Sequence, residues 1–360
     1  MHTREFYYSV AINLLRELIT TPSFSKEEAK TADLIESCLQ AFGCNTDRKK
    51  YNVWAHNRHF DADKPTLLLN SHHDTVKPNE GYTKDPFNPV IEHGQLFGLG
   101  SNDAGGPLVS LLAAFLWYHD RDDIPFNLIF AATAEEEISG RDGIELILPE
   151  LGKIACAVVG EPTQMQMAIA EKGLMVLDAV VSGRSGHAAR EEGENALYKA
   201  LEDIAWIRGY HFDKVSDLLG PVKMSVTIIN AGTQHNVVPD KCTYTVDVRV
   251  NECYTLEEVL EVIQANTAAD LKPRSMRMRS SGIESGHPLI QAGLSLGRTC
   301  YGSPTTSDKA LMPFPALKMG PGDSARSHTA DEFIYLGEIE SGIGIYIDLL
   351  ERYGQNLTKT

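Results

Sequence analysis

The feature that most constrains the fold of this chain is an apolar run that ends abruptly in polar residues. Residues 66–69 predict a buried strand, and the run stops at Asn-Ser-His-His-Asp, residues 70–74. In an open α/β sheet, chemically active groups collect beyond the carboxyl ends of the strands. His72 and Asp74 are two residues apart, so on an extended chain both side chains point the same way. This favours a metal-ligand histidine held by a carboxylate, although a polar strand end without a metal has the same pattern.

Two further predicted strands end in acidic residues. The apolar run at 127–133 leads into Glu135, Glu136 and Glu137, and the run at 155–160 leads into Glu161. Neighbouring carboxylates repel each other, and burial makes this costly unless a cation or protons compensate. A solvated acidic turn is the alternative. The position directly after a buried strand favours a binding site.

Between these runs lies a glycine-rich loop that contains Asp103. Residues 98–106 read Gly-Leu-Gly-Ser-Asn-Asp-Ala-Gly-Gly, and an apolar helix is predicted over 108–118. Asp103 either caps that helix or belongs to a site. If the three strands are parallel neighbours, all these side chains converge. One histidine with several carboxylates and no cysteine suits zinc, cobalt or manganese.

The C-terminal part of the chain repeats the pattern. A short strand is predicted at 315–319, and it leads into a glycine-rich loop that ends at His328. This histidine is a second candidate metal ligand, although a single loop histidine is usually solvent-exposed. The preceding polar loop contains Ser307 and Asp308.

The N-terminal part predicts mostly helices and loops. Residues 5–19 and 25–42 have helical patterns, and Ser25 is the candidate N-cap of the second helix, with Glu28 three residues later. Residues 77–98 are rich in Pro, Gly and Asn and predict a loop.

The middle of the chain has a different texture. Strands are predicted at 174–183, 222–231, 243–250 and near 275–281, with helices at 195–208 and 256–265. The order βαββαβ is the ferredoxin-like pattern. We therefore expect an inserted domain of residues 173–283 within a discontinuous domain of residues 1–172 and 284–360. His187 and Asn236 lie in polar turns of the insert, which spacing alone assigns to ordinary surface loops.

Composition restricts the partners and the compartment. The net charge is −16, which argues against nucleic acids and anionic membranes, since both require basic patches. No run of about 18 apolar residues predicts a membrane span, and the N-terminus lacks a signal-peptide pattern. The six cysteines are scattered without a Cys-x-x-Cys pair, which favours reduced thiols. We expect a cytoplasmic protein with no membrane or nucleic-acid partner.

The whole series of motifs resembles the dinuclear-zinc hydrolases of the M20 peptidase family, which include acetylornithine deacetylase and succinyl-diaminopimelate desuccinylase. Nine motifs occur in family order: Ser71-His72-His73-Asp74, Gly98 to Gly106 with Asp103, Thr133 to Glu137, Gly160 to Thr163, Gly186-His187, Gly232 to Pro239 with Asn236, Asp247-Val248-Arg249, Thr306-Ser307-Asp308, and Gly320 to His328 with Glu332. The resemblance implies a zinc-exopeptidase-like α/β domain, with a mixed sheet flanked by helices, and an inserted ferredoxin-like domain that serves as dimerisation and lid domain.

The resemblance also implies roles for the site residues. His72 and Glu161 would hold one zinc, Glu137 and His328 the other, and Asp103 would bridge them. Asp74 would orient His72, and Glu136 would be the general base. Cobalt or manganese are possible substitutes for zinc.

The insert would make the protein a homodimer. In the family its histidine, here His187, reaches the partner subunit's site and stabilises the oxyanion. Asn236 and Arg249 would bind substrate, with Arg249 on the α-carboxylate. Ser307 and Asp308 are further substrate-binding candidates, and Asp308 or Asp323 could meet a cationic side chain.

The implied reaction is hydrolysis of the amide bond of a small N-acyl amino acid. An acetylornithine deacetylase-like enzyme of arginine biosynthesis is the first interpretation. The alternatives are a desuccinylase acting on succinyl-diaminopimelate or on succinylated ornithine or citrulline, an amino- or dipeptidase, and a non-catalytic family member. A non-catalytic member would have lost a ligand, and none of the six expected acidic and histidine residues is missing. One departure is Ala104-Gly105-Gly106, where the family often has a lysine. His73, in the variable position, is expected to point away from His72.

Overall fold

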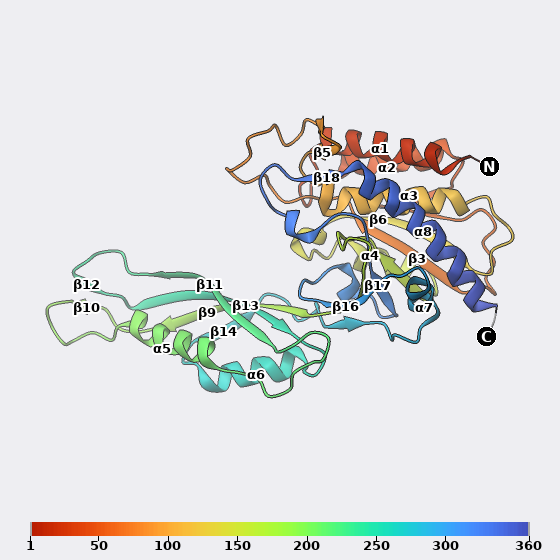
Figure 1. Ribbon diagram of the computed structural model, residues 1–360. Coiled ribbons are helices and arrows are strands. Elements are labelled where there is room, and N and C mark those ends of the chain that lie inside the picture. The colour runs from red at the N-terminus through yellow and green to blue at the C-terminus, as the bar shows by residue number, and fades with distance from the viewer. Residues whose placement is uncertain (1, 359–360) are drawn as a thin grey trace. The chain divides into compact units, whose positions relative to one another are not determined.

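The computed structural model describes residues 2–358, which divide into two compact units (Figure 1). Unit 1 contains the chain up to residue 169, residues 282–301 and the chain from residue 307. Unit 2 contains residues 170–281 and 302–306. We expected residues 302–306 in the discontinuous domain, but they pack with the insert. None of the described helices is long and apolar enough to cross a membrane.

Unit 1 is built on a mixed sheet. Its strands run in the order β1-β2-β6-β3-β7-β17-β8-β15, and β16 pairs with β8. The bounds are β1 Thr46–Lys49, β2 Asn52–His56, β3 Thr66–His72, β6 Asn127–Thr133, β7 Cys156–Val159, β8 Met167–Glu171, β15 Ser281–Gly282, β16 Cys300–Ser303 and β17 Ala316–Lys318. The four strands β6, β3, β7 and β17 are parallel neighbours. This mixed sheet with flanking helices confirms the expected α/β fold class.

Helices cover the two faces of this sheet unequally. The larger core joins one face to α1 (Arg4–Thr20), α2 (Ala29–Ala41), α3 (Gly106–Tyr118), α7 (Pro288–Ser295) and α8 (Leu336–Leu357). The smaller core joins the other face to the short helix α4 (Ile144–Ile147) and its neighbouring turns. Helix α3 is apolar almost all round because it is buried on nearly every side.

Two predictions for the N-terminal part are wrong. Helix α2 begins at Ala29, and Ser25 does not cap it; the Ser25 hydroxyl instead donates to the Asp74 carboxylate. The predicted loop 77–98 contains a hairpin of β4 (Ile91–Glu92) and β5 (Gln95–Phe97), which pairs with β18 (Phe333–Tyr335). His93 and Gly94 both have positive φ, as the tight turns of two-residue hairpins require, and His-Gly is not the usual pair for such a turn.

Unit 2 has the order βαββαβ. Its sheet runs β11-β13-β9-β14, all antiparallel, and α5 and α6 pack against one face. The bounds are β9 Gly173–Ser182, α5 Ala196–Gly209, β11 Lys223–Ala231, β13 Lys241–Val250, α6 Leu256–Asn266 and β14 Asp270–Pro273, and β10 (Gly186–His187) pairs with β12 (Val237–Val238). The last strand lies at 270–273 and not at 275–281, because α6 ends at Asn266 and only a short connection follows.

Candidate metal centre

The four parallel strands of unit 1 bring the expected ligands to one edge of the sheet. His72 is the last residue of β3, and the three glutamates follow β6 directly. Glu161 follows β7, and His328 lies in the loop after β17. The carboxyl ends of parallel strands share one edge, so residues far apart in the sequence converge there.

Asp103 lies between the two histidines. Its Oδ1 is 3.3 Å from His72 Nε2, and its Oδ2 is 3.7 Å from His328 Nε2. His72 Nε2 is also 3.8 Å from Glu161 Oε1, and His328 Nε2 is 3.0 Å from Glu137 Oε2. The two oxygens of one carboxylate therefore face two different histidine–glutamate pairs.

Among residues 2–358, two groups of three donor atoms are close enough to hold an ion. One group consists of His72, Asp103 and Glu137, and the other of His72, Glu136 and Glu161. The second group includes Glu136, which the sequence interpretation assigned as a base and not as a ligand. Imidazole and carboxylate donors without thiolates fit zinc, manganese or cobalt.

The charges of this cluster are poorly balanced in the protein alone. Burial, with the charges of Glu161, Asp308 and Glu137, raises the pKa of Glu136 well above its ordinary value, against the opposing effect of His72. Burial alone would lower the pKa of His72, but the hydrogen bonds to Asp103 and Asp74 outweigh it and raise that pKa well above its ordinary value. A divalent cation bound by these groups can take the place of the protons that they retain.

Asp74 holds two parts of the site together. His72 Nδ1 lies 3.0 Å from the Asp74 backbone oxygen and 3.3 Å from its Oδ1. The Asp74 carboxylate also accepts hydrogen bonds from the backbone N–H of Glu136 (3.1 Å) and Glu137 (3.2 Å) and from the Ser25 hydroxyl (2.7 Å). With Nδ1 engaged, Nε2 of His72 is the nitrogen turned toward Asp103.

Sequence reasoning missed a second buried carboxylate near this turn. Glu28 Oε1 accepts from the backbone N–H of Lys26 (2.9 Å) and of Glu135 (3.1 Å). Glu135 has a φ of 56°, so this hydrogen bond holds a residue in the left-handed region. Glu28 was interpreted only as part of a helix start, because a carboxylate that binds distant backbone N–H groups leaves no local sequence pattern.

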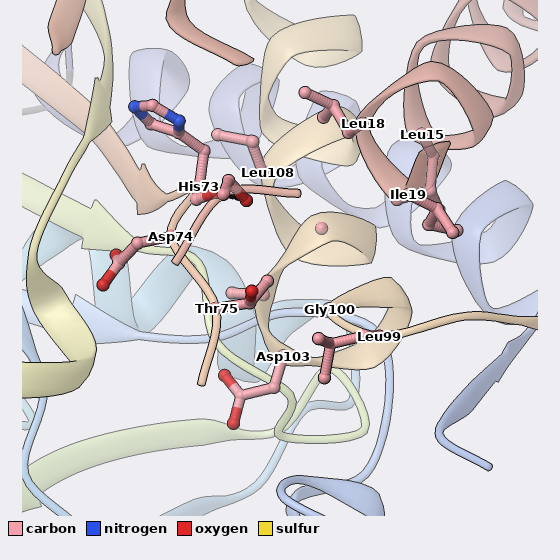
Figure 2. A pocket seen from close by; sticks show the side chains of 13 residues that line it. Leu15, Leu18, Ile19, His73, Asp74, Thr75, Leu99, Gly100, Asp103 and Leu108 are labelled. Carbon is pink, nitrogen blue, oxygen red and sulfur yellow. Dashed lines mark hydrogen bonds between the residues drawn. The ribbon is translucent and has the colours of Figure 1, made fainter. Parts of the chain in front are cut away.

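His73 lies outside the centre. Its Nδ1 is 2.9 Å from the Thr31 hydroxyl and its Nε2 is 2.9 Å from the Tyr51 carbonyl oxygen. Burial lowers its pKa to about 4, so the ring is neutral. Figure 2 shows that the ring points away from the carboxylates of Asp74 and Asp103. All three residues line a small cavity of about 20 Å³.

The two aspartates proposed for a cationic side chain have different surroundings. Asp308 is buried, and its Oδ2 accepts from the Thr133 hydroxyl at 2.8 Å at the end of β6. Asp323 accepts from the N–H of Ala325 and from the Gln164 side chain, at 2.9 and 2.5 Å. Ser307 precedes Asp308 and accepts from the N–H of Lys309.

Three predicted site residues belong to unit 2. His187 is exposed in β10, and its Nδ1 accepts from the Ala189 N–H. Asn236 is exposed in the turn before β12. Arg249 lies on β13, where Asp247 binds its guanidinium through two oxygens, at 2.8 and 2.9 Å. All metal-ligand candidates belong to unit 1, so the roles of these three residues stay predictions.

Comparison with known proteins identifies similar sequences over almost the whole chain. The family model described as Peptidase family M20/M25/M40 matches residues 68–352. A succinyl-diaminopimelate desuccinylase of Stenotrophomonas maltophilia (strain K279a) is 26% identical over 96% of this chain and 99% of its own length. An acetylornithine deacetylase of Proteus mirabilis (strain HI4320) is 27% identical over 95% of this chain and 96% of its own length.

Solved structures share the fold at lower identity. An M20 family metallo-carboxypeptidase of Sulfolobus solfataricus has a TM-score of 0.79 and 15% identity, covering 96% of this chain and 99% of that one. An aminopeptidase of Bacillus cereus has a TM-score of 0.76 and 19% identity, covering 96% and 98%. A Bacillus subtilis protein described as a dinuclear metal binding peptidase of the M20 family has a TM-score of 0.69 and 16% identity, covering 96% and 98%.

Proposed function

Because the chain belongs to peptidase family M20/M25/M40, we propose that it is a metal-dependent hydrolase of the amide bond of a small N-acyl amino acid. The observation that carries the proposal is the position of Asp103, whose two oxygens face two histidine–glutamate pairs. A binding module without catalysis has no need of two such pairs around a shared carboxylate.

The centre is proposed to hold two zinc ions, for which cobalt or manganese could substitute. His72 and Glu161 would bind one, Glu137 and His328 the other, and Asp103 both. When bound, such ions supply Lewis acidity that polarises an amide carbonyl and lowers the pKa of water. The donors fit this pair of ions because each ion would meet one imidazole and at least two carboxylates.

Glu136 is proposed to move the proton. It follows β6 directly, its backbone N–H is fixed by Asp74, and its surroundings raise its pKa. A carboxylate of raised pKa can accept the proton of the attacking water and deliver it to the nitrogen of the departing amine as the C–N bond breaks. His187 of a partner subunit would stabilise the oxyanion, and Asn236 and Arg249 would bind the substrate.

The preferred substrate is acetylornithine, as in arginine biosynthesis. The desuccinylase interpretation stays the second candidate, since the two named relatives are almost equally similar to this chain. An amino- or dipeptidase is the third. Six free thiols fit a reducing compartment, so we propose a cytoplasmic enzyme.

A substrate panel tests the proposed reaction. Amine release is measured after loading with zinc or cobalt, with acetylornithine, acetylcitrulline, succinylornithine, succinyl-diaminopimelate, acetylmethionine and a dipeptide. We expect turnover of acetylornithine, and turnover at least about 100-fold slower by a metal-loaded Glu136→Gln control. A succinyl preference would replace the first substrate with the second, and no turnover of any member by protein with two bound metals would overturn the proposal.

We further propose that the protein forms a homodimer through unit 2. Strand β11 is an edge strand whose residues are largely exposed, including Ile228 and Ile229 (51% and 44% exposed). Tyr198 and Leu201 of α5 are also exposed, at 66% and 49%. A long apolar edge strand is a template for pairing with a second chain, and natural proteins cover such edges.

Sedimentation of single variants tests the dimer. Ile229→Lys places a charge on the edge strand and should convert the dimer to a monomer at micromolar concentration. Leu294→Lys, at an exposed leucine of α7 in unit 1, is the matched control and should leave the dimer intact. An unchanged sedimentation coefficient for Ile229→Lys would contradict this interface.

A further inference from the structure

The buried carboxylate of Glu332 lies at the centre of the loop that carries Asp103. Its Oε1 accepts from the backbone N–H of Asn102 (2.8 Å) and of Asp103 (2.9 Å), and its Oε2 accepts from that of Gly100 (3.0 Å). Its backbone oxygen accepts from the N–H of Gly98 at 3.0 Å. Four N–H groups of one short loop thus converge on a single residue that is 2% exposed.

These hydrogen bonds require the loop to be wrapped around Glu332. Gly98 and Gly100 have φ of 150° and 75°, which glycine adopts readily. The peptide bond between Asp103 and Ala104, directly after the last of these N–H donors, is cis. The three hydrogen bonds that the described residues donate to the Glu332 carboxylate all come from backbone N–H groups, and an ionised carboxylate is an acceptor only.

A second set of contacts joins the same two segments. The Asn102 side chain donates from Nδ2 to the Asp323 carbonyl oxygen and accepts at Oδ1 from the Asp323 N–H, both at 3.0 Å. Both partners of this amide pair are buried or partly buried. The segment 323–332 is therefore fixed to the Asp103 loop at both ends, and His328 lies between the two attachment points.

We propose that Glu332 is a positioning residue for the metal centre: it fixes the Asp103 carboxylate between the two histidines and links it to the loop of His328. This inference rests on the proposed function, because the centre is taken to bind two divalent cations. We do not assign Glu332 as a ligand, since both of its carboxylate oxygens already accept hydrogen bonds from backbone N–H groups.

The geometry also predicts that replacing the Glu332 carboxylate with an amide breaks this set of hydrogen bonds. In Glu332→Gln, one carboxylate oxygen becomes an NH₂ group of nearly the same size. In either amide orientation at least one backbone N–H then faces another donor, so a buried N–H loses its partner.

A matched control lies next to it in the sequence. Asp331 also binds backbone N–H groups, those of Thr83 (2.8 Å) and Lys84 (2.9 Å), but in a different and more exposed loop. Asp331→Asn therefore makes the same chemical change one residue away without touching the Asp103 loop.

The test is a zinc titration of the metal-free full chain, in competition with a chromophoric chelator. We expect Glu332→Gln to weaken the affinity for zinc about 10- to 100-fold, the range typical of partners that orient ligands, and Asp331→Asn to change it less than about twofold. At saturating zinc, kcat should fall and KM should change little. A merely structural role would lower the melting temperature and leave the affinity of the folded protein unchanged, which would overturn the proposal. Wild-type protein that binds no zinc would instead overturn the proposed function.

A measurement on the wild type covers the case in which Glu332→Gln does not fold. In the metal-free protein, hydrogen exchange of the amides at residues 100, 102 and 103 should be slow, because Glu332 already binds them. Rapid exchange there, at the rate of an open loop, would show that the loop is not fixed before the metal binds and would overturn the proposal.

Discussion

One buried carboxylate, Asp74, holds two parts of the candidate centre at once. The sequence indicates only its spacing from His72, whereas the structure adds backbone hydrogen bonds to the N–H groups of Glu136 and Glu137. A change at Asp74 therefore acts on ligands that come from two different strands. The adjacent glutamates also have unequal surroundings, since only Glu137 contacts His328.

Asp74→Asn should weaken metal binding without removing a ligand. In asparagine an NH₂ group replaces one carboxylate oxygen and cannot accept a hydrogen bond. The backbone N–H of either Glu136 or Glu137 therefore loses its acceptor, and the turn shifts. We expect the affinity for zinc to fall about 10- to 100-fold, measured by competition with a chelator. Asp122→Asn, at an exposed position, is the control. Equal affinities for the two variants would contradict the role of Asp74.

Glu136→Gln separates a base from a ligand. As a base, Glu136 contributes to proton transfer, so kcat should fall about 100- to 10,000-fold while two metals stay bound. The metal content is measured by plasma emission spectroscopy on the same sample as kcat. Loss of one metal equivalent would instead support the donor group of His72, Glu136 and Glu161.

At the scale of elements, the glycine loop before α3 depends on close backbone approach. A Cβ at Gly105 would lie 2.4 Å from the Gly100 backbone oxygen and 2.6 Å from a methyl carbon of Leu15. Neither the loop nor helix α1 can accept this atom without moving. The glycines that the sequence shows near Asp103 are thus required by packing and not only by turning.

Gly105→Ala should destabilise unit 1 and disturb the centre. Overpacking of this kind costs about 1–3 kcal/mol of unfolding free energy, measured by urea denaturation, and zinc affinity should fall as well. Gly209→Ala is the control, because a Cβ there meets no atom within 4 Å. An unchanged midpoint for Gly105→Ala would mean that the loop relaxes freely.

Local patterns explain which elements could be predicted. The strands at 66–69 and 127–133 were recognisable because apolar runs and their polar ends are features of neighbouring residues, and the insert was recognisable from alternation. The roles of Glu28 and Glu332 were not recognisable, because their partners are backbone N–H groups of distant loops, and a backbone donor has no sequence identity. The β4–β5 hairpin was missed because a His-Gly turn lacks the usual residues.

At the scale of the molecule, all candidate ligands lie in unit 1, while unit 2 has a core of its own. An ion bound only by the folded form stabilises that form by mass action. The two units therefore differ in how they respond to loss of metal.

Chelation should lower the melting temperature of unit 1 and not that of unit 2. A cation at 100-fold its Kd contributes about 2.7 kcal/mol, and this contribution is lost on addition of a chelator. Calorimetry can follow the two units, and the fluorescence of Trp206, the one tryptophan of unit 2, can identify its transition. A transition of unit 1 that does not respond to the chelator would mean that no metal was bound.

The place of β17 in the sheet has a consequence for synthesis on the ribosome. β7 ends at Val159, but its parallel neighbour β17 begins only at Ala316, after the whole of unit 2, whose last residues are 302–306. A nascent chain can thus complete most of unit 2 while the sheet of unit 1 still lacks an inner strand and exposes apolar edges. The loop of His328 emerges later still. The growing polypeptide therefore has no complete set of candidate ligands until the loop of His328 leaves the exit tunnel, and an ion that needs both histidines would bind only after that point.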